Sequence, residues 1–172
     1  MLASREGSMA GTTVTPIQLG FTTPAPADLV WIYLTDPERV EQWFTVASPL
    51  GSIGDTYRLD FGDGSVVEGP ITALDPGRGF AHRWAWLDID PRQETTVRWT
   101  VEALGSGGSR VGLVHDGWSE AGADEAIRDD HEAYWSGYLD DLEDVLEDAA
   151  AAYATASPWA AARTSAPPSP TG

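Results

Sequence analysis

The sequence contains no cysteine, no lysine and no long run of apolar residues. Without cysteine, disulfide bonds, thiolate catalysis and cysteine-ligated zinc are excluded. No stretch approaches the ~20 apolar residues of a membrane-spanning helix, and the N-terminal residues MLASREGSMAG lack the apolar core of a secretory signal. We therefore expect a cytoplasmic protein with no membrane insertion.

Basic side chains are scarce. Ten arginines stand against 27 Asp and Glu, which gives a formal net charge of -17. This charge would repel a phosphate backbone and argues against a nucleic-acid partner. Many of the acidic residues lie between Glu120 and Asp148. We interpret them as the solvated face of a helix, with an acidic docking surface for a basic partner as the alternative.

Motifs for nucleophilic and nucleotide chemistry are also missing. No serine occupies a nucleophile elbow, and no glycine-rich loop joins a strand to a helix. Residues 105–108 are glycine-rich, but they form a turn between two expected strands. We predict no cofactor.

The chain has 172 residues with 42% hydrophobic content, which suits one domain with tails. We place the domain at residues 12–152. Residues 1–11 are expected to be a disordered tail or a remnant of cloning. Residues 153–172 are rich in Ala, Ser and Pro and are expected to be disordered as well.

Residues 25–44, APADLVWIYLTDPERVEQWF, predict two short helices joined by a hinge. Pro26 suits the first turn of one helix, and apolar residues then recur at helical spacing. Asp36 can cap a second helix that opens with Pro37. Both helices precede a long series of strands.

Alternating apolar residues separated by turn signals predict six strands, at residues 12–21, 55–61, 65–74, 80–86, 94–103 and 109–116. Pro16 would need an edge or an unpaired position in the first of them. Because the later strands follow each other through short turns, the sheet should be antiparallel.

The last expected element is an amphipathic helix over residues 124–152, with an apolar stripe that includes Trp135, Leu139, Leu142 and Leu146. At ~1.5 Å per residue it spans roughly 40 Å and can cross a small sheet. Gly137 interrupts it, which would allow a strand or a ligand to come close. The expected fold is α+β, with a curved antiparallel sheet wrapped round this helix.

This order of elements, with LVWIYLTDPERVEQWF, GSRVGLVHDGW and HEAYWSGYLDDLEDVLE at its characteristic places, resembles the START-like (SRPBCC, helix-grip) superfamily. Within it, the sequence is most similar to the Aha-type family, named after the activator of the heat-shock protein 90 ATPase. The resemblance covers about residues 12–150. It implies a cavity between sheet and C-terminal helix, which various members use for lipids, polyketides, hormones or other apolar molecules.

Aromatic and histidine side chains on the inward faces are the candidates to line such a cavity. They are Trp84, Trp86, Trp99, Leu113, His115, Trp118, His131, Trp135 and Tyr138. A pocket of aromatic rings with few polar groups suits a planar or polycyclic ligand. Ordinary core packing is the alternative for each tryptophan.

Three histidines, His82, His115 and His131, could converge and bind zinc or act as a general base. We predict no metal site, because their spacing matches no histidine ligand motif. If the protein is an enzyme, His115 or His82 with Asp116 would form the acid–base pair. Arg83 and Arg98 are expected on the outer face of the sheet.

The leading functional hypothesis is a non-enzymatic protein that binds a small apolar or aromatic molecule. A polyketide cyclase or aromatase and a sequestering or self-sacrificing resistance protein against a natural product are the alternatives. A co-regulator of a chaperone ATPase is a further alternative, although the eukaryotic co-chaperone has an N-terminal chaperone-binding domain that we do not expect here. A weak homodimer is also left open.

Overall fold

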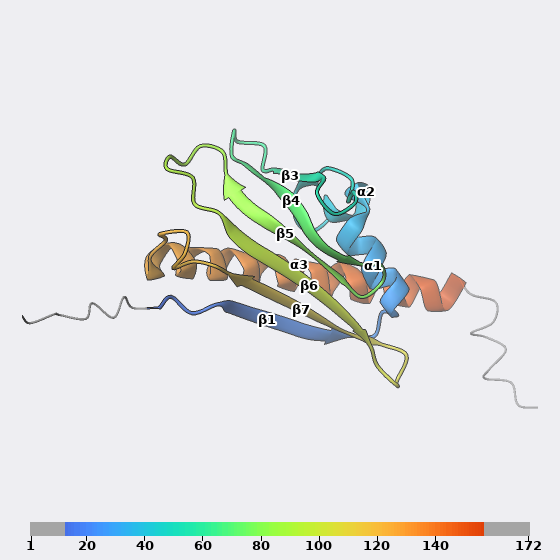
Figure 1. The fold of residues 1–172 in the computed structure, drawn as a ribbon. Coiled ribbons are helices and arrows are strands. Elements are labelled where there is room, and N and C mark those ends of the chain that lie inside the picture. Colours follow the sequence, from blue (N-terminus) through green and yellow to red (C-terminus); the bar gives the residue numbers. More distant parts are fainter. Residues whose placement is uncertain (1–12, 157–172) are drawn as a thin grey trace, which may run out of the picture.

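The computed structural model describes residues 13–156, and their strands form one seven-stranded sheet (Figure 1). In chain order the strands are β1 (Ile17–Thr23), β2 (Val46–Ala47), β3 (Thr56–Asp60), β4 (Val66–Asp75), β5 (Gly79–Trp86), β6 (Thr95–Ala103) and β7 (Ser109–Asp116). Their order in the sheet is β1-β7-β6-β5-β4-β3-β2, and each neighbouring pair is antiparallel. The predicted antiparallel sheet is confirmed.

Apart from shifts of one or two residues at strand ends, the sheet differs from the sequence prediction in its first strand and in one additional strand. The first strand begins at Ile17, so Pro16 precedes it and no ladder hydrogen bond is lost. The additional strand β2 has only two residues and carries no alternating pattern of its own. It exists because Val46 and Ala47 pair with Asp60 and Leu59 of β3.

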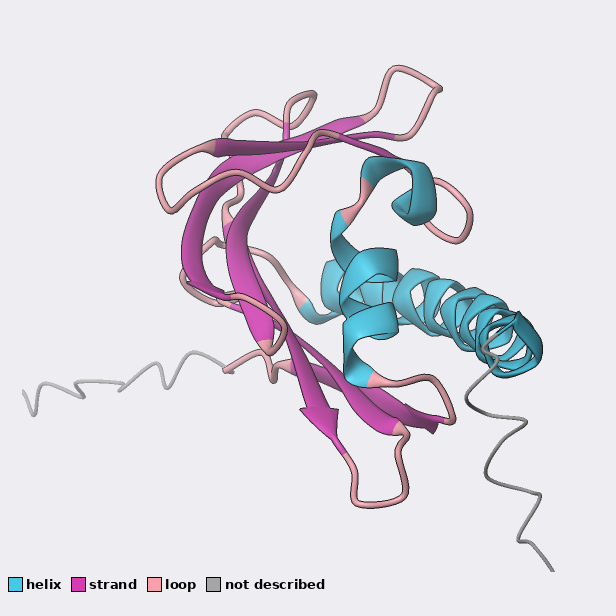
Figure 2. Ribbon diagram, turned by 90° about the vertical axis from the view of Figure 1, so that its right-hand side faces the viewer, coloured by secondary structure: helices cyan, strands magenta, loops and turns pink. Residues whose placement is uncertain are grey.

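The helices lie on the concave side of the curved sheet, as Figure 2 shows. They are α1 (Ala27–Thr35), α2 (Pro37–Val40) and α3 (Glu125–Ala156). Helix α3 runs four residues beyond its expected end at Ala152. The helix-grip arrangement expected from the sequence is confirmed. Of the expected tails at 1–11 and 153–172, the structure describes only residues 153–156, which continue α3.

The hinge between α1 and α2 forms for local reasons. Asp36 caps α2 by accepting a hydrogen bond from the Glu38 backbone N–H at 3.1 Å, and Pro37 opens the helix as predicted. Pro26 stands one position earlier than expected, at the N-cap of α1. The Trp43 indole then donates to the Tyr33 carbonyl at 2.8 Å, which holds the segment after α2 against α1.

The core lies between the inward residues of the sheet and one stripe of α3. The inward side chains of β5, β6 and β7 are buried, and they meet Trp135, Leu139, Leu142 and Leu146 of the helix. Arg83 and Arg98 point the other way, and Arg83 pairs with Glu94 on the outer face at 2.9 Å. Within residues 13–156, no helix has both the length and the apolar character needed to cross a membrane.

Candidate functional site

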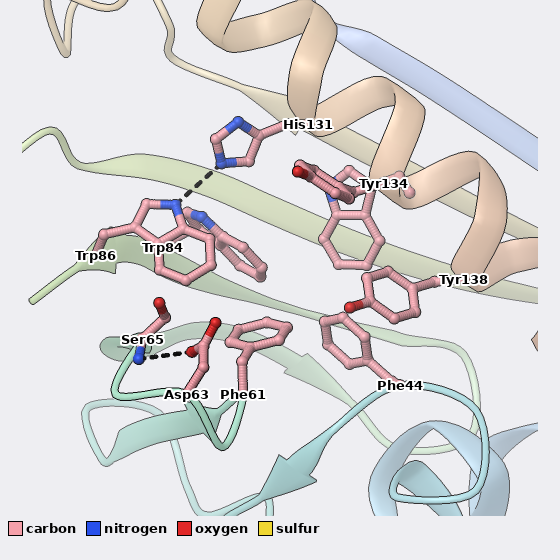
Figure 3. A pocket seen from close by; sticks show the side chains of 10 residues that line it. Phe44, Phe61, Asp63, Ser65, Trp84, Trp86, His131, Tyr134 and Tyr138 are labelled. Carbon is pink, nitrogen blue, oxygen red and sulfur yellow. Dashed lines mark hydrogen bonds between the residues drawn. The ribbon is translucent and has the colours of Figure 1, made fainter.

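A pocket of about 350 Å³ opens between the sheet and α3 (Figure 3). Its volume lies in the lower part of the range found for small-molecule sites, about 300–1,000 Å³. Ten side chains line it: Phe44, Phe61, Asp63, Ser65, Trp84, Trp86, His131, Tyr134, Trp135 and Tyr138.

Four separate segments supply these side chains. Strand β5 contributes Trp84 and Trp86, which share its inward face because they are two residues apart. Helix α3 contributes residues 131, 134, 135 and 138, a spacing that places them on one helical face. The turn between β3 and β4 and the segment after α2 complete the walls with Phe61, Asp63, Ser65 and Phe44.

Glycine makes the β3–β4 turn tight enough to bring Asp63 to the pocket. Gly62 and Gly64 have φ angles of 82° and 92°, a region that other residues rarely adopt. Between them, the Asp63 carboxylate accepts a hydrogen bond from the Ser65 backbone N–H at 2.9 Å. That bond lowers the pKa of Asp63, so the side chain is a carboxylate at neutral pH.

The aromatic rings pack on one another around the pocket. Trp84 and Trp135 have ring centroids 5.3 Å apart, and Phe44 lies 5.2 Å from Trp135. Trp84 and Trp135 are only 4% and 2% exposed, whereas Tyr134 is 70% exposed. The pocket therefore has a rigid aromatic floor and a mouth beside Tyr134.

His131 is held in one neutral form by two hydrogen bonds. Its Nδ1 donates to the Ile127 carbonyl at 2.7 Å, and its Nε2 accepts from the Trp86 indole N–H at 3.0 Å. Burial lowers the pKa of His131, although the bond to Ile127 opposes the shift. Neither ring nitrogen is available for proton transfer while both bonds persist.

His115 lies behind the pocket floor and is fully buried. Both ring nitrogens are hydrogen-bonded, to Trp135 at 3.0 Å and to Thr95 at 2.6 Å. Burial holds the pKa of His115 well below its usual value. The neighbouring Trp118 donates to the His115 backbone carbonyl at 2.9 Å, so it too belongs to the layer behind the pocket.

The proposed acid–base pairs are not brought together. His115 and Asp116 are consecutive on β7 and face opposite sides of the sheet, with Asp116 in an outer groove beside Arg83. His82 is buried beside Tyr57, donates from Nδ1 to the Arg83 carbonyl, and does not line the pocket. Burial lowers the pKa of His82 to about 4.

The three histidines nevertheless surround one side chain. Their ring centroids lie 6.2, 5.4 and 6.1 Å from that of Trp84, for His82, His115 and His131 respectively. They act as packing partners of an indole. In the part of the chain that the structure describes, no three His, Asp or Glu side chains are placed to hold a metal ion.

The structure separates the nine predicted ligand-binding residues into two layers. Trp84, Trp86, His131, Trp135 and Tyr138 line the pocket, while Trp99, Leu113, His115 and Trp118 are buried behind it. Sequence reasoning missed Phe44, Phe61, Asp63, Ser65 and Tyr134. Three of these carried a signal: Tyr134 adjoins the apolar stripe of the last helix, Phe44 ends the second expected helix, and Phe61 ends the strand expected at residues 55–61.

One polar atom at the floor lacks a partner. Among residues 13–156, the Trp84 indole nitrogen is the buried side-chain nitrogen or oxygen that makes no hydrogen bond. A buried indole N–H normally donates to an acceptor. Because this nitrogen is itself buried, a molecule in the pocket does not reach it without a change in side-chain conformation.

Comparison with known structures finds the same fold in several proteins. DynU16, from the dynemicin biosynthetic locus, is 28% identical with a TM-score of 0.63; the match covers 77% of this chain and 47% of DynU16. The chain thus spans less than half the length of DynU16. CalU16 from Micromonospora echinospora is 21% identical over 86% of this chain and 80% of its own, with a TM-score of 0.62.

The Aha1 dimer from Colwellia psychrerythraea is 19% identical, with a TM-score of 0.65 over 77% of this chain and 96% of its own. No curated protein sequence gives a significant match. Residues 24–147 match the family model described as Activator of Hsp90 ATPase homolog 1-like protein. That segment contains the hinge helices, the sheet from β2 to β7 and every residue of the pocket. The chain therefore belongs to the Activator of Hsp90 ATPase homolog 1-like protein family, as its resemblance implied.

Proposed function

We propose that the protein binds a small apolar or aromatic molecule in the pocket between its sheet and α3. The observation that carries this proposal is the lining itself. Seven of its ten side chains are Phe, Trp or Tyr, and they come from four segments of the chain. Rings of this kind offer a large apolar contact area to a planar ligand.

The polar groups of the pocket support binding more than catalysis. His131 uses both ring nitrogens in hydrogen bonds within the protein. A cyclase or aromatase-like enzyme is the alternative, and only measured turnover would favour it.

A sequestering function is the second candidate. It is favoured by the 28% identity to DynU16, a protein of the dynemicin biosynthetic locus. A reversible carrier and a self-sacrificing resistance protein differ in one observable. After exposure to a reactive natural product, mass spectrometry should find a carrier intact and a sacrificial protein cleaved or modified.

The binding proposal is tested by titrating the protein with neutral fused-ring aromatic compounds, with intrinsic tryptophan fluorescence and calorimetry as readouts. Phe61→Ala and Tyr138→Ala should each weaken binding by about tenfold, since an aromatic contact contributes roughly 0.5–1.5 kcal/mol beyond its buried area. Tyr153→Ala, on the same helix but 60% exposed and outside the pocket, is the matched control.

Circular dichroism must first show that each variant is folded. Binding that is weakened in the two lining variants and unchanged in the control supports the proposal. If no compound of the panel changes the fluorescence of the wild-type protein or releases heat, the proposal is wrong.

A further inference from the structure

The charges of the residues that line the pocket favour ligands with one sign of charge over the other. The ten lining residues include one carboxylate, Asp63, and no arginine. An anionic ligand would therefore lose its hydration without gaining a cationic partner. Ligands with a carboxylate or phosphate are disfavoured by the lining alone.

The arginine nearest in sequence to the pocket residues of α3 does not face the pocket. Arg128 precedes His131 by three residues, but its guanidinium donates to the carbonyls of Thr15 and Pro16, each at 3.0 Å. It also pairs with Asp129 and Glu132. These contacts hold Arg128 toward the N-terminal end of β1, away from the aromatic walls.

Negative charge reaches the pocket from two elements. Figure 3 shows the Asp63 side chain beside Phe61 at the rim. Across the pocket, the Tyr138 hydroxyl lies near the carboxylates of Asp63 and Asp141 and responds to their charge. Its pKa is raised first by burial, then by the charges of neighbouring groups that include Tyr134, Asp141 and Asp63.

Aromatic walls are compatible with positive charge. A cation near the face of a Trp, Tyr or Phe ring is attracted by the ring quadrupole, and the attraction grows as water is removed. Phe44 and Tyr138 meet edge to face with centroids 4.8 Å apart, and Phe61 and Trp86 lie 5.2 Å apart. Aromatic rings in several orientations therefore line the pocket beside the Asp63 carboxylate.

We propose that the pocket selects aromatic ligands that carry a protonated amine over neutral or anionic ligands of the same size. The aromatic part would contact Trp84, Trp86 and Trp135, and the amine would lie toward Asp63 and the mouth. This inference rests on the proposed binding function and adds the charge class of the ligand.

Three probes with the same ring system test it: 2-naphthylmethylamine, 2-naphthalenemethanol and 2-naphthoate, which are cationic, neutral and anionic near neutral pH. Calorimetric titrations should rank them in that order, with the amine bound about tenfold more tightly than the alcohol. At about 1 M salt, where the Debye length is about 3 Å, the preference should shrink.

Asp63→Asn removes the charge and keeps an amide oxygen that can accept the Ser65 N–H, so the turn is preserved. It should weaken amine binding by about threefold and leave alcohol binding unchanged. Asp140→Asn is the control, because it removes the same charge from an exposed site about 200° round α3 from Tyr138.

Amine and alcohol that bind equally, a carboxylate that binds best, or equal effects of the two substitutions would each overturn the charge inference while leaving the binding function in place. Failure of all three probes to bind would instead contradict the proposed function itself. The expected ranking with an effect confined to Asp63→Asn supports both.

Discussion

The Trp135 indole N–H donates to Nδ1 of His115 at 3.0 Å, joining α3 to β7 inside the core. Because an indole nitrogen can only donate, Nδ1 of His115 carries no proton and Nε2 carries it. Nε2 then donates to the Thr95 hydroxyl at 2.6 Å, and that hydroxyl donates to the Trp84 carbonyl at 3.3 Å. This chain of bonds fixes the floor of the pocket.

Replacing His115 with leucine should destabilise the protein by roughly 2 kcal/mol or more, because the buried Trp135 N–H would lose its acceptor. Urea denaturation near neutral pH measures the change. A double-mutant cycle with Trp135→Phe should give a coupling energy of about 1 kcal/mol. Additive effects would show that the bond contributes nothing to stability.

Tyr134→Ala should separate binding from stability. Tyr134 is 70% exposed at the pocket mouth, so its removal should change the free energy of unfolding by less than about 0.5 kcal/mol. Affinity for a fused-ring ligand should nevertheless fall severalfold, because one wall is lost. Calorimetry on wild type, Tyr134→Ala and Tyr153→Ala provides the check, and equal affinities would place the ligand away from the mouth.

Stability should fall as the pH decreases below about 6.5. Burial depresses the pKa of His82 from 6.5 to about 4, so in this interval the unfolded chain binds a proton that the folded protein does not. The contribution of His82 is fully present above pH 6.5 and is lost by about pH 4, to a total of about 3 kcal/mol.

His115 and His131 are shifted in the same direction and should steepen the loss. Denaturation curves at several pH values should therefore show a smaller slope for His82→Phe, which keeps a ring in the core but cannot titrate. An unchanged slope in this variant would mean that His82 is not the group responsible.

Gly137→Ala should stabilise the protein by about 0.5–1 kcal/mol. The sequence suggested that Gly137 allows a close approach, but a Cβ at this exposed position would meet nothing within 4 Å. Gly69→Ala is the opposite case, since its Cβ would collide with the Arg83 carbonyl of the neighbouring strand. Thermal denaturation should move in opposite directions for the two variants.

The fold could be predicted because its signals are local. The glycine turn at residues 62–64 and the alternation in β5 and β6 each depend on a few adjacent residues. The pocket could be predicted only in part. Alternation identifies Trp84 and Trp99 as inward, but only Trp84 lines the pocket, because the rings of Trp43 and Trp135 pack against Trp99.

The missed residues show the same limit. Asp63 and Ser65 lie in the β3–β4 turn, which has no periodicity, and Phe44 lies in the segment after α2, which ends at Val40 before the expected helix does. His115 is also instructive. A sequence does not distinguish a buried structural histidine from a catalytic one. The hydrogen-bond partners of the ring nitrogens do, and those of His115 are both buried within the protein.

The pairing of β1 with β7 determines the order in which the chain can assemble. Ile17 lies opposite His115, whereas β3 to β7 each pair with the strand just before or after them in sequence. Hairpins between sequence neighbours close short loops, but the β1–β7 pair must close a loop of most of the domain. During synthesis, β1 can therefore pair with β7 only after residue 116 has been made. Helix α3, which forms one wall of the pocket, is made after β7.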